Sequence, residues 1–506
     1  MRHLYDLVVH RALGVCIAVA AMAAACSVPK AAAPPASTTS ATVEAPAGLT
    51  VALVSATAAQ RIDGFGASGA WWPNDLAKFP PAEQKLVADK LFGPDGIALS
   101  AYRYNIGGGG AGVRTPARAA KQLADDTAGL IFLRAANDAH VPILTGFVNS
   151  APPRFTTSGK ACGGALKPGA EDAYAQYLAG IVEHLHDDEH ITLQFVSPMN
   201  EPDNNFGDCG QEGMSVPVSQ RATVVRALAK ALARHAHYAK VIADETTADA
   251  ILAAEAPQWL GVPGTKHDVA AIAHHTYDFP DDALRRLVPP IAARFGKPTW
   301  MTEICCYKGS GGVATSFGAQ YDPTMTQGFW LADQVYSDLT VAGDSAWYWW
   351  TALSPFLGCD PRADPQCPTR KNTSGWNDGL LYYDEHYATS GVTQIFPTKR
   401  YSVLGQFSRY VRPGACRHAV TGAPAGVRML AFAEGDRWVV VAWNEGANEQ
   451  SLGIALPSGK AAPAEATATF TNEHSDLTRG ATPVRTNTGS WLVTLPPGTI
   501  ATYTFG

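Results

Sequence analysis

Residues 195–202, FVSPMNEP, and residues 300–303, WMTE, are two short apolar runs that end near or at a glutamate, Glu201 and Glu303. Each run is typical of a buried strand. A carboxylate at the end of such a strand is costly to bury unless it is paired. Two of them in one chain predict an acid/base and a nucleophile, the pair that a glycosidase uses. Two structural glutamates in salt bridges are the alternative.

Apolar strands and amphipathic helices alternate around these two stretches. The strands are continuously apolar, as in a parallel sheet whose faces are covered by helices. We therefore predict an α/β fold, a (β/α)8 TIM barrel, with Glu201 closing the fourth strand and Glu303 the seventh at one mouth; an open doubly wound sheet is the alternative. The expected strands are residues 62–65, 98–106, 141–148, 191–199, 240–243, 269–277, 298–304 and 345–351, and the expected helices are 81–91, 116–139, 169–186, 215–235, 248–260, 281–295 and 324–340.

From residue 401 the pattern changes to short strands separated by Gly, Pro and Asn turns. This pattern predicts a C-terminal β-sandwich without helices. The isolated strand pattern at residues 50–56 can join it and bring the two ends of the chain together. The expected sandwich strands are residues 428–434, 437–444, 450–456, 466–471, 490–495 and 499–505.

The N-terminus has the pattern of an export signal. A positively charged start precedes an apolar run at residues 12–25, which is too short to span a bilayer and ends at Cys26. Three alanines before Cys26 resemble a bacterial lipoprotein signal, in which this cysteine is lipidated; a plain secretory signal is the alternative. We expect an exported protein, either a cell-surface lipoprotein or a secreted one.

The expected domain organisation follows from these patterns. Residues 27–48, rich in Pro, Ala, Ser and Thr, predict a disordered linker. The predicted segments are a signal peptide at residues 1–26, the linker at 27–48, the sandwich strand at 49–60, the catalytic barrel at 61–400 and the sandwich at 401–506.

Seven cysteines follow the signal, and export permits disulfides. Cys359 and Cys367 bracket one loop, and Cys162 and Cys209 lie in loops after two neighbouring strands, so we expect these two pairs. Cys305, Cys306 and Cys416 remain, which predicts at least one free thiol. No spacing typical of a zinc site is present, so we expect no metal and no cofactor.

The charge balance is mildly acidic, with 39 Lys and Arg against 45 Asp and Glu, and no basic stripe suits nucleic acid. We expect a polysaccharide or oligosaccharide as the partner, no nucleic acid, contact with a membrane only through a lipid anchor, and a monomer. The 12 Trp and 17 Tyr suit sugar stacking but also a large core.

Four motifs, taken together and in this order, resemble glycoside hydrolase family 30 and span nearly everything from residue 48 to the end. The resemblance implies a clan A barrel with an attached sandwich and a retaining mechanism. Two loops, residues 69–72 (GAWW) and 147–152 (FVNSAP), look most like the endo-β-1,6-galactanase branch. The four motifs are IDGFG at residues 62–66, SPMNEP at 197–202, MTE at 301–303 and LGQFSRYVRPG at 404–414.

The resemblance also implies roles for single residues. Glu201 is then the acid/base and Glu303 the nucleophile, and Asn200 hydrogen-bonds the sugar 2-hydroxyl. Arg103 lies in an apolar strand, where an unpaired guanidinium is costly, and by resemblance it holds the nucleophile ionised; a core ion pair is the alternative. Tyr277 is the expected contact of the nucleophile.

Other candidates for substrate binding are less specific. His275 and its neighbour His274 are equal candidates at the end of the sixth strand, and either can be a core residue. Alternation along the strand cannot direct all four aromatic residues of the run 347–350 into the cavity, so some pack behind the barrel, and Trp349 is the expected sugar platform. Trp71 and Asn149 are subsite candidates, although loop packing explains them nearly as well.

One acidic pair has two possible roles, and the function has several alternatives. Asp244 and Glu245, after the fifth strand, can bind sugar hydroxyls or cap the next helix. The leading hypothesis is an endo-β-1,6-galactanase acting on galactan side chains of the arabinogalactan type. The alternatives are another family 30 glycosidase, such as an endo-β-1,6-glucanase, a glucosylceramidase-like or a xylanase-like enzyme, and a surface lipoprotein that binds glycans without cleaving them.

Overall fold

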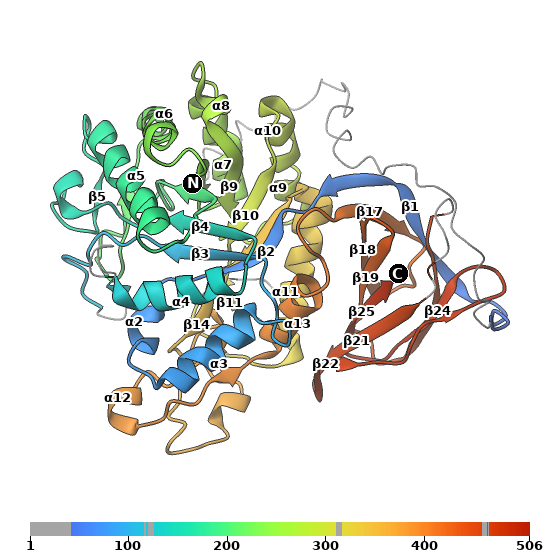
Figure 1. Cartoon of the computed structure of the whole chain (residues 1–506). Helices are drawn as coiled ribbons and strands as arrows, with labels where there is room; N and C mark the ends of the chain where they lie inside the picture. The colour runs from blue at the N-terminus through green and yellow to red at the C-terminus, as the bar shows by residue number, and fades with distance from the viewer. Residues whose placement is uncertain (1–41, 116–117, 120–125, 310–315, 458–462, 464) are drawn as a thin grey trace.

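The computed structural model describes residues 42–115, 118–119, 126–309, 316–457, 463 and 465–506. Eight parallel strands close into a barrel, which Figure 1 shows beside a separate sheet domain. The (β/α)8 barrel prediction is confirmed. In chain order the barrel strands are β2 (Gly64–Ser68), β3 (Ala101–Asn105), β4 (Ile143–Phe147), β6 (Phe195–Ser197), β8 (Lys240–Thr246), β9 (Val269–His275), β10 (Thr299–Glu303) and β13 (Ala346–Trp349).

The barrel strands are apolar on both faces because each face is buried. Their inward side chains fill the barrel and include Trp300 and Tyr348 among small residues such as Ala271. Their outward side chains pack against the surrounding helices. These helices are α3 (Pro81–Phe92), α4 (Thr127–Asp138), α5 (Glu171–Asp187), α6 (Val218–His235), α7 (Asp249–Trp259), α9 (Asp282–Arg285), α10 (Val288–Phe295) and α11 (Met325–Ser337).

The second domain is a large, mostly antiparallel sheet at the right of Figure 1. The N-terminal strand β1 (Thr50–Arg61) lies inside this sheet, antiparallel to β17 and parallel to β20. The predicted sandwich with an N-terminal strand is therefore confirmed. Its other strands are β17 (Cys416–Thr421), β18 (Val427–Glu434), β19 (Arg437–Asn444), β20 (Gln450–Ala455), β21 (Ala466–Asn472), β22 (Ser475–Arg479), β23 (Val484–Arg485), β24 (Trp491–Leu495) and β25 (Thr499–Phe505).

The structure corrects the expected absence of helices from the sandwich region. Helix α13 (Lys399–Ser408) crosses the predicted boundary at residue 401 and packs against both domains. Gly405 shows how close the contact is, because a Cβ there would lie 2.8 Å from Ile97 and 2.9 Å from Leu477. The helix therefore joins the barrel to the sheet domain. The predicted helix at residues 281–295 is also divided, into α9 and α10, at a point followed by two prolines.

The predicted linker is ordered over its last residues. The backbone N–H of Val43 donates to Arg485 of β23, and the N–H of Ala45 donates to the side chain of Asn487. Residues 42–48 are thus held against the sandwich, and the disorder prediction is wrong for them. The predicted signal, the lipidation at Cys26 and linker residues 27–41 lie outside the described residues.

Cys162 is bonded to Cys209, and Cys359 to Cys367, as expected from the sequence. The neighbouring residues Cys305 and Cys306 form a third disulfide. Cys416 is disulfide-bonded as well. The prediction of a free thiol among these seven cysteines is therefore wrong.

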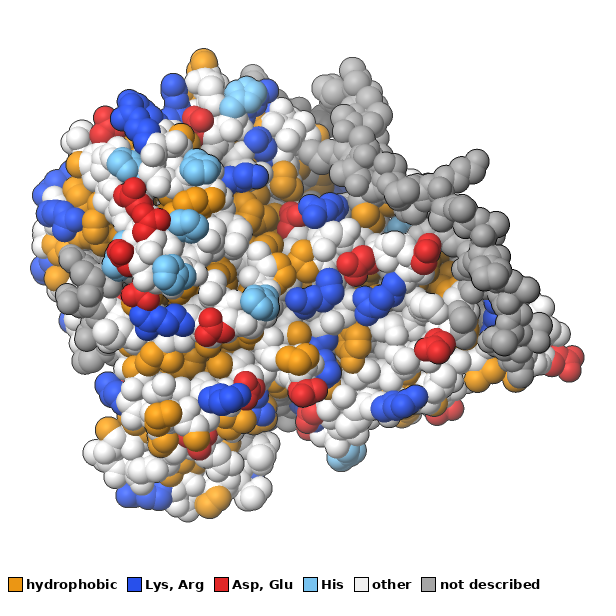
Figure 2. Space-filling view, viewed as in Figure 1, with side chains coloured by type: hydrophobic (Ala, Val, Ile, Leu, Met, Phe, Trp, Pro, Cys, Tyr) orange, Lys and Arg blue, Asp and Glu red, His pale blue; other side chains and the backbone are white. Residues whose placement is uncertain are grey.

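Acidic and basic side chains are interspersed on the face of the molecule that Figure 2 shows. None of the helices in the described part of the chain combines the length and the apolar character that a membrane crossing needs.

Candidate active site

A cleft of about 500 Å³ opens at the carboxyl ends of the barrel strands. Glu303 is the last residue of β10, and Glu201 follows β6 after a turn of three residues. Parallel strands place their carboxyl ends at the same mouth, so both glutamates line this cleft. The two motifs that predicted the fold therefore meet, 102 residues apart in the chain.

The two carboxylates lie close together on the floor of the cleft. Glu201 is 7% exposed and Glu303 is 3% exposed. His275 lies between them, with Nδ1 3.3 Å from Glu201 Oε1 and 3.8 Å from Glu303 Oε1. One oxygen of each glutamate and one ring nitrogen of His275 all fall within 4.8 Å of one another.

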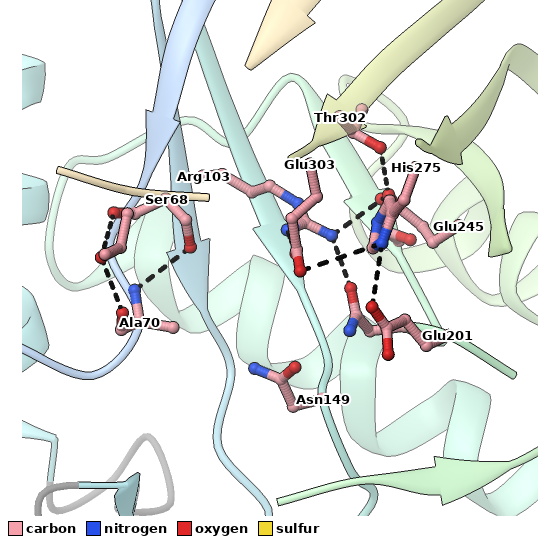
Figure 3. Close-up of polar contacts among 12 residues, drawn as sticks. Ser68, Ala70, Arg103, Asn149, Glu201, Glu245, His275, Thr302 and Glu303 are labelled. Atoms are coloured by element: carbon pink, nitrogen blue, oxygen red, sulfur yellow. Dashed lines mark hydrogen bonds and ion pairs between the residues drawn. The ribbon is translucent and has the colours of Figure 1, made fainter. Parts of the chain in front are cut away.

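Arg103 holds the carboxylate of Glu303 from below. Its Nη1 donates to Glu303 Oε2 at 2.5 Å, and its Nη2 donates to Asn200 Oδ1 at 2.7 Å (Figure 3). Nη2 also lies 3.1 Å from Glu245 Oε2. The guanidinium is fully buried, so these charge-assisted contacts replace its hydration. The contact that the resemblance implied between Arg103 and the second glutamate is present.

Glu245 anchors the other side of this cluster. Its Oε2 accepts hydrogen bonds from His275 Nε2 at 3.1 Å and from Thr302 Oγ1 (Figure 3). Burial alone would raise the pKa of Glu245, but Arg103 and His275 lower it to about 2. Glu245 is therefore an anion that neither binds sugar nor caps a helix, which corrects both sequence interpretations. Its neighbour Asp244 is ion-paired with Arg221.

The electrostatics favour a proton on Glu201. Burial raises the pKa of Glu201, a hydrogen bond from His275 partly offsets this, and the charge of Glu303 raises it further. Burial lowers the pKa of His275, but Glu303, Glu201 and Glu245 together raise it to about 9. Arg103 and His275 then supply two positive charges, and Glu245 and Glu303 supply two negative charges. The cluster is neutral when Glu201 carries its proton, the form that a general acid needs.

The backbone around Glu201 is unusual. Glu201 has φ 46° and Glu245 has φ 64°, both in the left-handed region that non-glycine residues rarely adopt. The N–H of Glu201 donates to the carbonyl of Glu245 at 2.9 Å, so the two turns support each other. Such conformations concentrate at functional sites, where the surrounding structure holds them.

Several of the predicted substrate residues line the cleft. Tyr277 donates its hydroxyl to Glu303 Oε1 at 2.9 Å. Asn200 presents its amide beside Glu201, with its oxygen occupied by Arg103. Asn149 donates to Asn105 at 2.8 Å. Its own oxygen has no partner among the described residues.

The structure does not place Trp349 where the predicted sugar platform would be. Trp349 is fully buried and points outward, where its Nε1 donates to the carbonyl of Asp378. Ala346 and Tyr348 point into the barrel, so alternation sends Trp349 to the helix layer. Trp350, one residue later, lines the cleft, and its ring centroid lies 5.5 Å from that of Trp71.

His275 is placed differently from its predicted role as well. It is fully buried below the two carboxylates and does not line the cleft, so it acts on them rather than on the substrate. His274 points to the opposite side of the strand, where its ring nitrogens lie 2.9 Å from Asp249 and 3.0 Å from Asp344.

The sequence interpretation missed Glu212, a fully buried carboxylate that contacts the cleft residue Trp71. Its Oε2 accepts from Trp71 Nε1 at 3.1 Å, and its Oε1 accepts from the N–H groups of Gly108 and Gly110, each at 3.1 Å. Burial raises its pKa to about 7, against the effect of these donors. The run of glycines at residues 107–110 was the available signal, because backbone N–H groups that are buried away from water need an acceptor in the protein.

Glu201, His275 and Glu303 have a spacing that suits a cation. The same atoms already serve other partners, since Arg103 and Tyr277 donate to the two oxygens of Glu303. A protonated His275 also offers no lone pair to a metal. The donor set therefore fits proton transfer better than metal binding.

Comparison with known proteins gives a family-model match over part of the chain and solved structures with the same fold. Residues 49–261 match the family model O-Glycosyl hydrolase family 30. These findings support glycoside hydrolase family 30 for this chain. The catalytic domain of the family 30 xylanase C from Talaromyces cellulolyticus has a TM-score of 0.69 at 21% identity, over 90% of this chain and 100% of that one.

Two further solved structures share the fold. A conserved exported protein from Bacteroides fragilis has a TM-score of 0.72 at 21% identity, over 90% of this chain and 100% of that chain. An endo-β-1,6-glucanase has a TM-score of 0.64 at 16% identity, over 91% of this chain and 96% of that chain. At these identities the likeness shows the barrel and its attached sheet domain.

Proposed function

We propose that the protein is a retaining endo-β-1,6-galactanase that hydrolyses galactan side chains of the arabinogalactan type. Glu303 attacks the anomeric carbon and forms a covalent glycosyl-enzyme, while Glu201 donates its proton to the departing oxygen. Glu201 then removes a proton from water, which attacks the same carbon and releases Glu303. The two inversions leave the product with the configuration of the substrate.

The observation that carries the mechanism is the short separation of the two glutamates. An oxygen of Glu201 lies within 4.8 Å of an oxygen of Glu303. Carboxyl groups about 5–5.5 Å apart suit direct attack, whereas an inverting enzyme separates them by about 6.5–9.5 Å to admit a water molecule. The geometry supports retention.

The neighbours of each glutamate suit its proposed role. Arg103 and Tyr277 occupy both oxygens of Glu303, and these contacts favour an anionic nucleophile. Burial keeps the pKa of Glu201 above its ordinary value, which favours the proton of a general acid. After attack, the charge on Glu303 is lost, so the pKa of Glu201 falls and it becomes a base.

The substrate assignment rests on the loops. Ala70, Trp71, Trp72 and Asn149 come from the two motifs that resemble the galactanase branch, and all four line the cleft. The contact between Trp71 and Glu212 fixes one of these side chains at the mouth.

An endo-β-1,6-glucanase is the second candidate, since a solved structure with that activity shares the fold and the linkage type. We further propose that the protein acts outside the cell as a monomer. In this proposal the signal peptide is residues 1–26, the catalytic barrel is residues 61–400 and the sandwich is residues 401–506. A surface protein that binds glycans without cleaving them is less consistent with two buried glutamates that lie side by side in one cleft.

Reducing-sugar release tests this proposal. The chain from residue 48 is incubated with de-arabinosylated β-1,6-galactan, β-1,6-glucan and xylan, and Glu303→Gln serves as the inactive control. We expect release from galactan alone, as a ladder of oligosaccharides, and none from the variant. Release from glucan or xylan alone contradicts the substrate. If the folded protein releases reducing sugar from none of the three polysaccharides, the proposal that it is a glycosidase fails.

A further inference from the structure

The chain that leaves the nucleophile strand builds one wall of the cleft. After Glu303 it passes through the Cys305–Cys306 disulfide and enters β11 (Tyr307–Lys308), which pairs with β12 (Ser316–Phe317). The N–H of Gly318 donates to the carbonyl of Cys306 at 3.2 Å. These pairings place Phe317 at the rim of the cleft, beside the disulfide.

Phe317 is 56% exposed, and it has the greatest exposure of the large hydrophobic side chains in the described part of the chain. Its ring centroid lies 5.4 Å from that of Trp376 and 6.0 Å from that of Tyr277. Tyr277 in turn contacts Glu303. An apolar wall therefore runs from the nucleophile to the rim.

The disulfide forms the floor below this wall. Tyr277 Oη lies 3.8 Å from Cys305 Sγ. Glu303 and Cys306 both line the cleft, so a molecule bound at Glu303 lies near Cys306 as well. The N–H of Cys306 donates to the carbonyl of Asn377 at 3.1 Å, which ties the floor to the segment that carries Trp376. The sulfur atoms present a polarisable, apolar surface.

Binding of a ligand that covers the apolar area of an exposed aromatic side chain is favourable, because it removes that area from water. A β-galactopyranose has an axial 4-hydroxyl, so the hydrogens on C3, C4 and C5 share one face of the ring. This face is apolar and can stack on the face of a single aromatic ring such as Phe317, whereas the axial 4-hydroxyl points to the opposite face of the sugar. The wall thus complements the ring of a galactosyl unit.

We propose that Phe317 and Trp376, above the Cys305–Cys306 disulfide, form a sugar-binding subsite that stacks against the C–H face of a galactosyl residue. The identity of the sugar rests on the proposed function, whereas the position of the subsite rests on the wall itself. Phe317 is a binding residue in this assignment and takes no part in the chemical step.

The test measures binding apart from cleavage. β-1,6-Galactotetraose is titrated into Glu303→Gln protein, which lacks the nucleophile, and the Kd is compared with that of the same protein carrying Phe317→Ala. We expect the Kd to rise about five- to tenfold, in line with one lost stacking contact. Phe317→Trp should restore tight binding. Leu53→Ala, at a side chain 54% exposed on the sandwich strand β1, is the matched control and should leave the Kd unchanged.

A second pair of variants tests the floor. Cys305→Ser with Cys306→Ser should raise the KM for galactan, while Cys359→Ser with Cys367→Ser removes a disulfide outside the cleft and should not. An unchanged Kd in Phe317→Ala contradicts the subsite. The subsite is also contradicted if Phe317→Ala leaves the Kd unchanged in the Glu303→Gln protein but lowers kcat in protein that retains Glu303. The Phe317 ring would then act on the reaction through its contact with Tyr277.

The subsite and the proposed function can fail separately. β-1,6-Glucotetraose is titrated in parallel. If the protein cleaves only glucan, the galactanase proposal fails, and the effect of Phe317→Ala on the glucotetraose Kd still decides whether the wall binds sugar. If the protein cleaves galactan and Phe317→Ala leaves the Kd unchanged, only the subsite fails.

Discussion

His274 and His275 are consecutive residues of β9, yet they belong to two different charged clusters on opposite faces of the barrel sheet. His275 points inward and contacts Glu201 and Glu245. His274 points outward and contacts Asp249, at the start of α7, and Asp344, before β13. Both rings are fully buried, and carboxylates raise the pKa of both above the ordinary value, against the effect of burial.

The difference lies in what each cluster can reach. Glu201 and Glu303 line the cleft, so a change of charge in the inner cluster can act on a molecule bound there. Asp249 and Asp344 are fully buried between the sheet and its helices, where ion pairs fix the packing. Buried charge is therefore not by itself a sign of catalysis, and access to the cleft distinguishes the two clusters.

Removal of the nucleophile should have the largest effect on activity. Glu303→Gln keeps the shape of the side chain but cannot attack, and we expect kcat on galactan to fall by about 10⁴-fold or more. Glu255→Gln, in an ion pair with Arg221 outside the cleft, is the control and should remain active. Reducing-sugar assays of both variants measure the difference. Activity of Glu303→Gln above about one hundredth of wild type would contradict the assignment.

Removal of the general acid should cost about 10²- to 10⁴-fold on galactan. Because burial raises the pKa of Glu201, the active acid form is present at low pH and is lost as the pH rises through that raised pKa. Wild-type activity should therefore fall on the alkaline side. Glu201→Gln should lose less activity on an aryl β-galactoside, whose leaving group needs no proton, and its pH profile should lack the alkaline fall. If the activity of Glu201→Gln still falls at alkaline pH, a group other than Glu201 is responsible for that titration.

The two histidines give a matched pair of smaller effects. In His275→Gln we expect kcat to fall about 10- to 100-fold. The hydrogen bond from His275 lowers the pKa of Glu201, so its loss should move the alkaline fall to higher pH. In His274→Gln we expect kcat within about twofold of wild type, and a lower free energy of unfolding by about 3 kcal/mol, because two buried carboxylates lose their cation.

The pH dependence of stability checks the outer cluster. The folded pKa of His274 is raised, so its contribution to stability is complete below about pH 6.5, its unfolded value, and is lost as the pH rises through the folded pKa. Denaturant unfolding across that range should show the loss in wild type and not in His274→Gln. Equal effects of the two substitutions on kcat would remove the distinction between the clusters.

Substitution of Glu212 is expected to have the smallest effect on turnover. Burial raises the pKa of this carboxyl to about 7. The folded protein then holds a proton that the unfolded chain releases near its ordinary pKa, so stability falls as the pH rises from about 4.5 to 7, by roughly 3 kcal/mol. Glu212→Gln, which cannot ionise, should abolish this fall, while its single amide oxygen can accept either from Trp71 or from the glycine N–H groups. Thermal unfolding between pH 4 and 8 measures it, and an unchanged pH slope in the variant would show that Glu212 is not the group responsible.

Much of the barrel, and the meeting of Glu201 and Glu303 in one cleft, could be predicted from the sequence, because strand periodicity and strand order place both residues at the same mouth. Arg103 was predictable for a related reason, since a guanidinium in an apolar strand needs a carboxylate partner. These features depend on local pattern and on the topology of one fold.

The remaining errors concern orientation and long-range pairing. The run at residues 347–350 predicts alternation but not its phase, which the packing of Ala346 and Tyr348 inside the barrel decides against Trp349. Glu212 meets Gly108 through a loop that no period describes. Phe317 lies in β12, and its place at the cleft depends on the pairing of β12 with β11, which no sequence pattern describes.

The most direct test of the account follows the anomeric protons of the first products by NMR during hydrolysis of β-1,6-galactotetraose, before mutarotation equilibrates them. Two glutamates whose oxygens lie within 4.8 Å of each other predict that the β-anomer appears first and the α-anomer only later, as mutarotation proceeds. Initial release of the α-anomer would show inversion, and Glu303 would then be a base acting through water rather than the nucleophile.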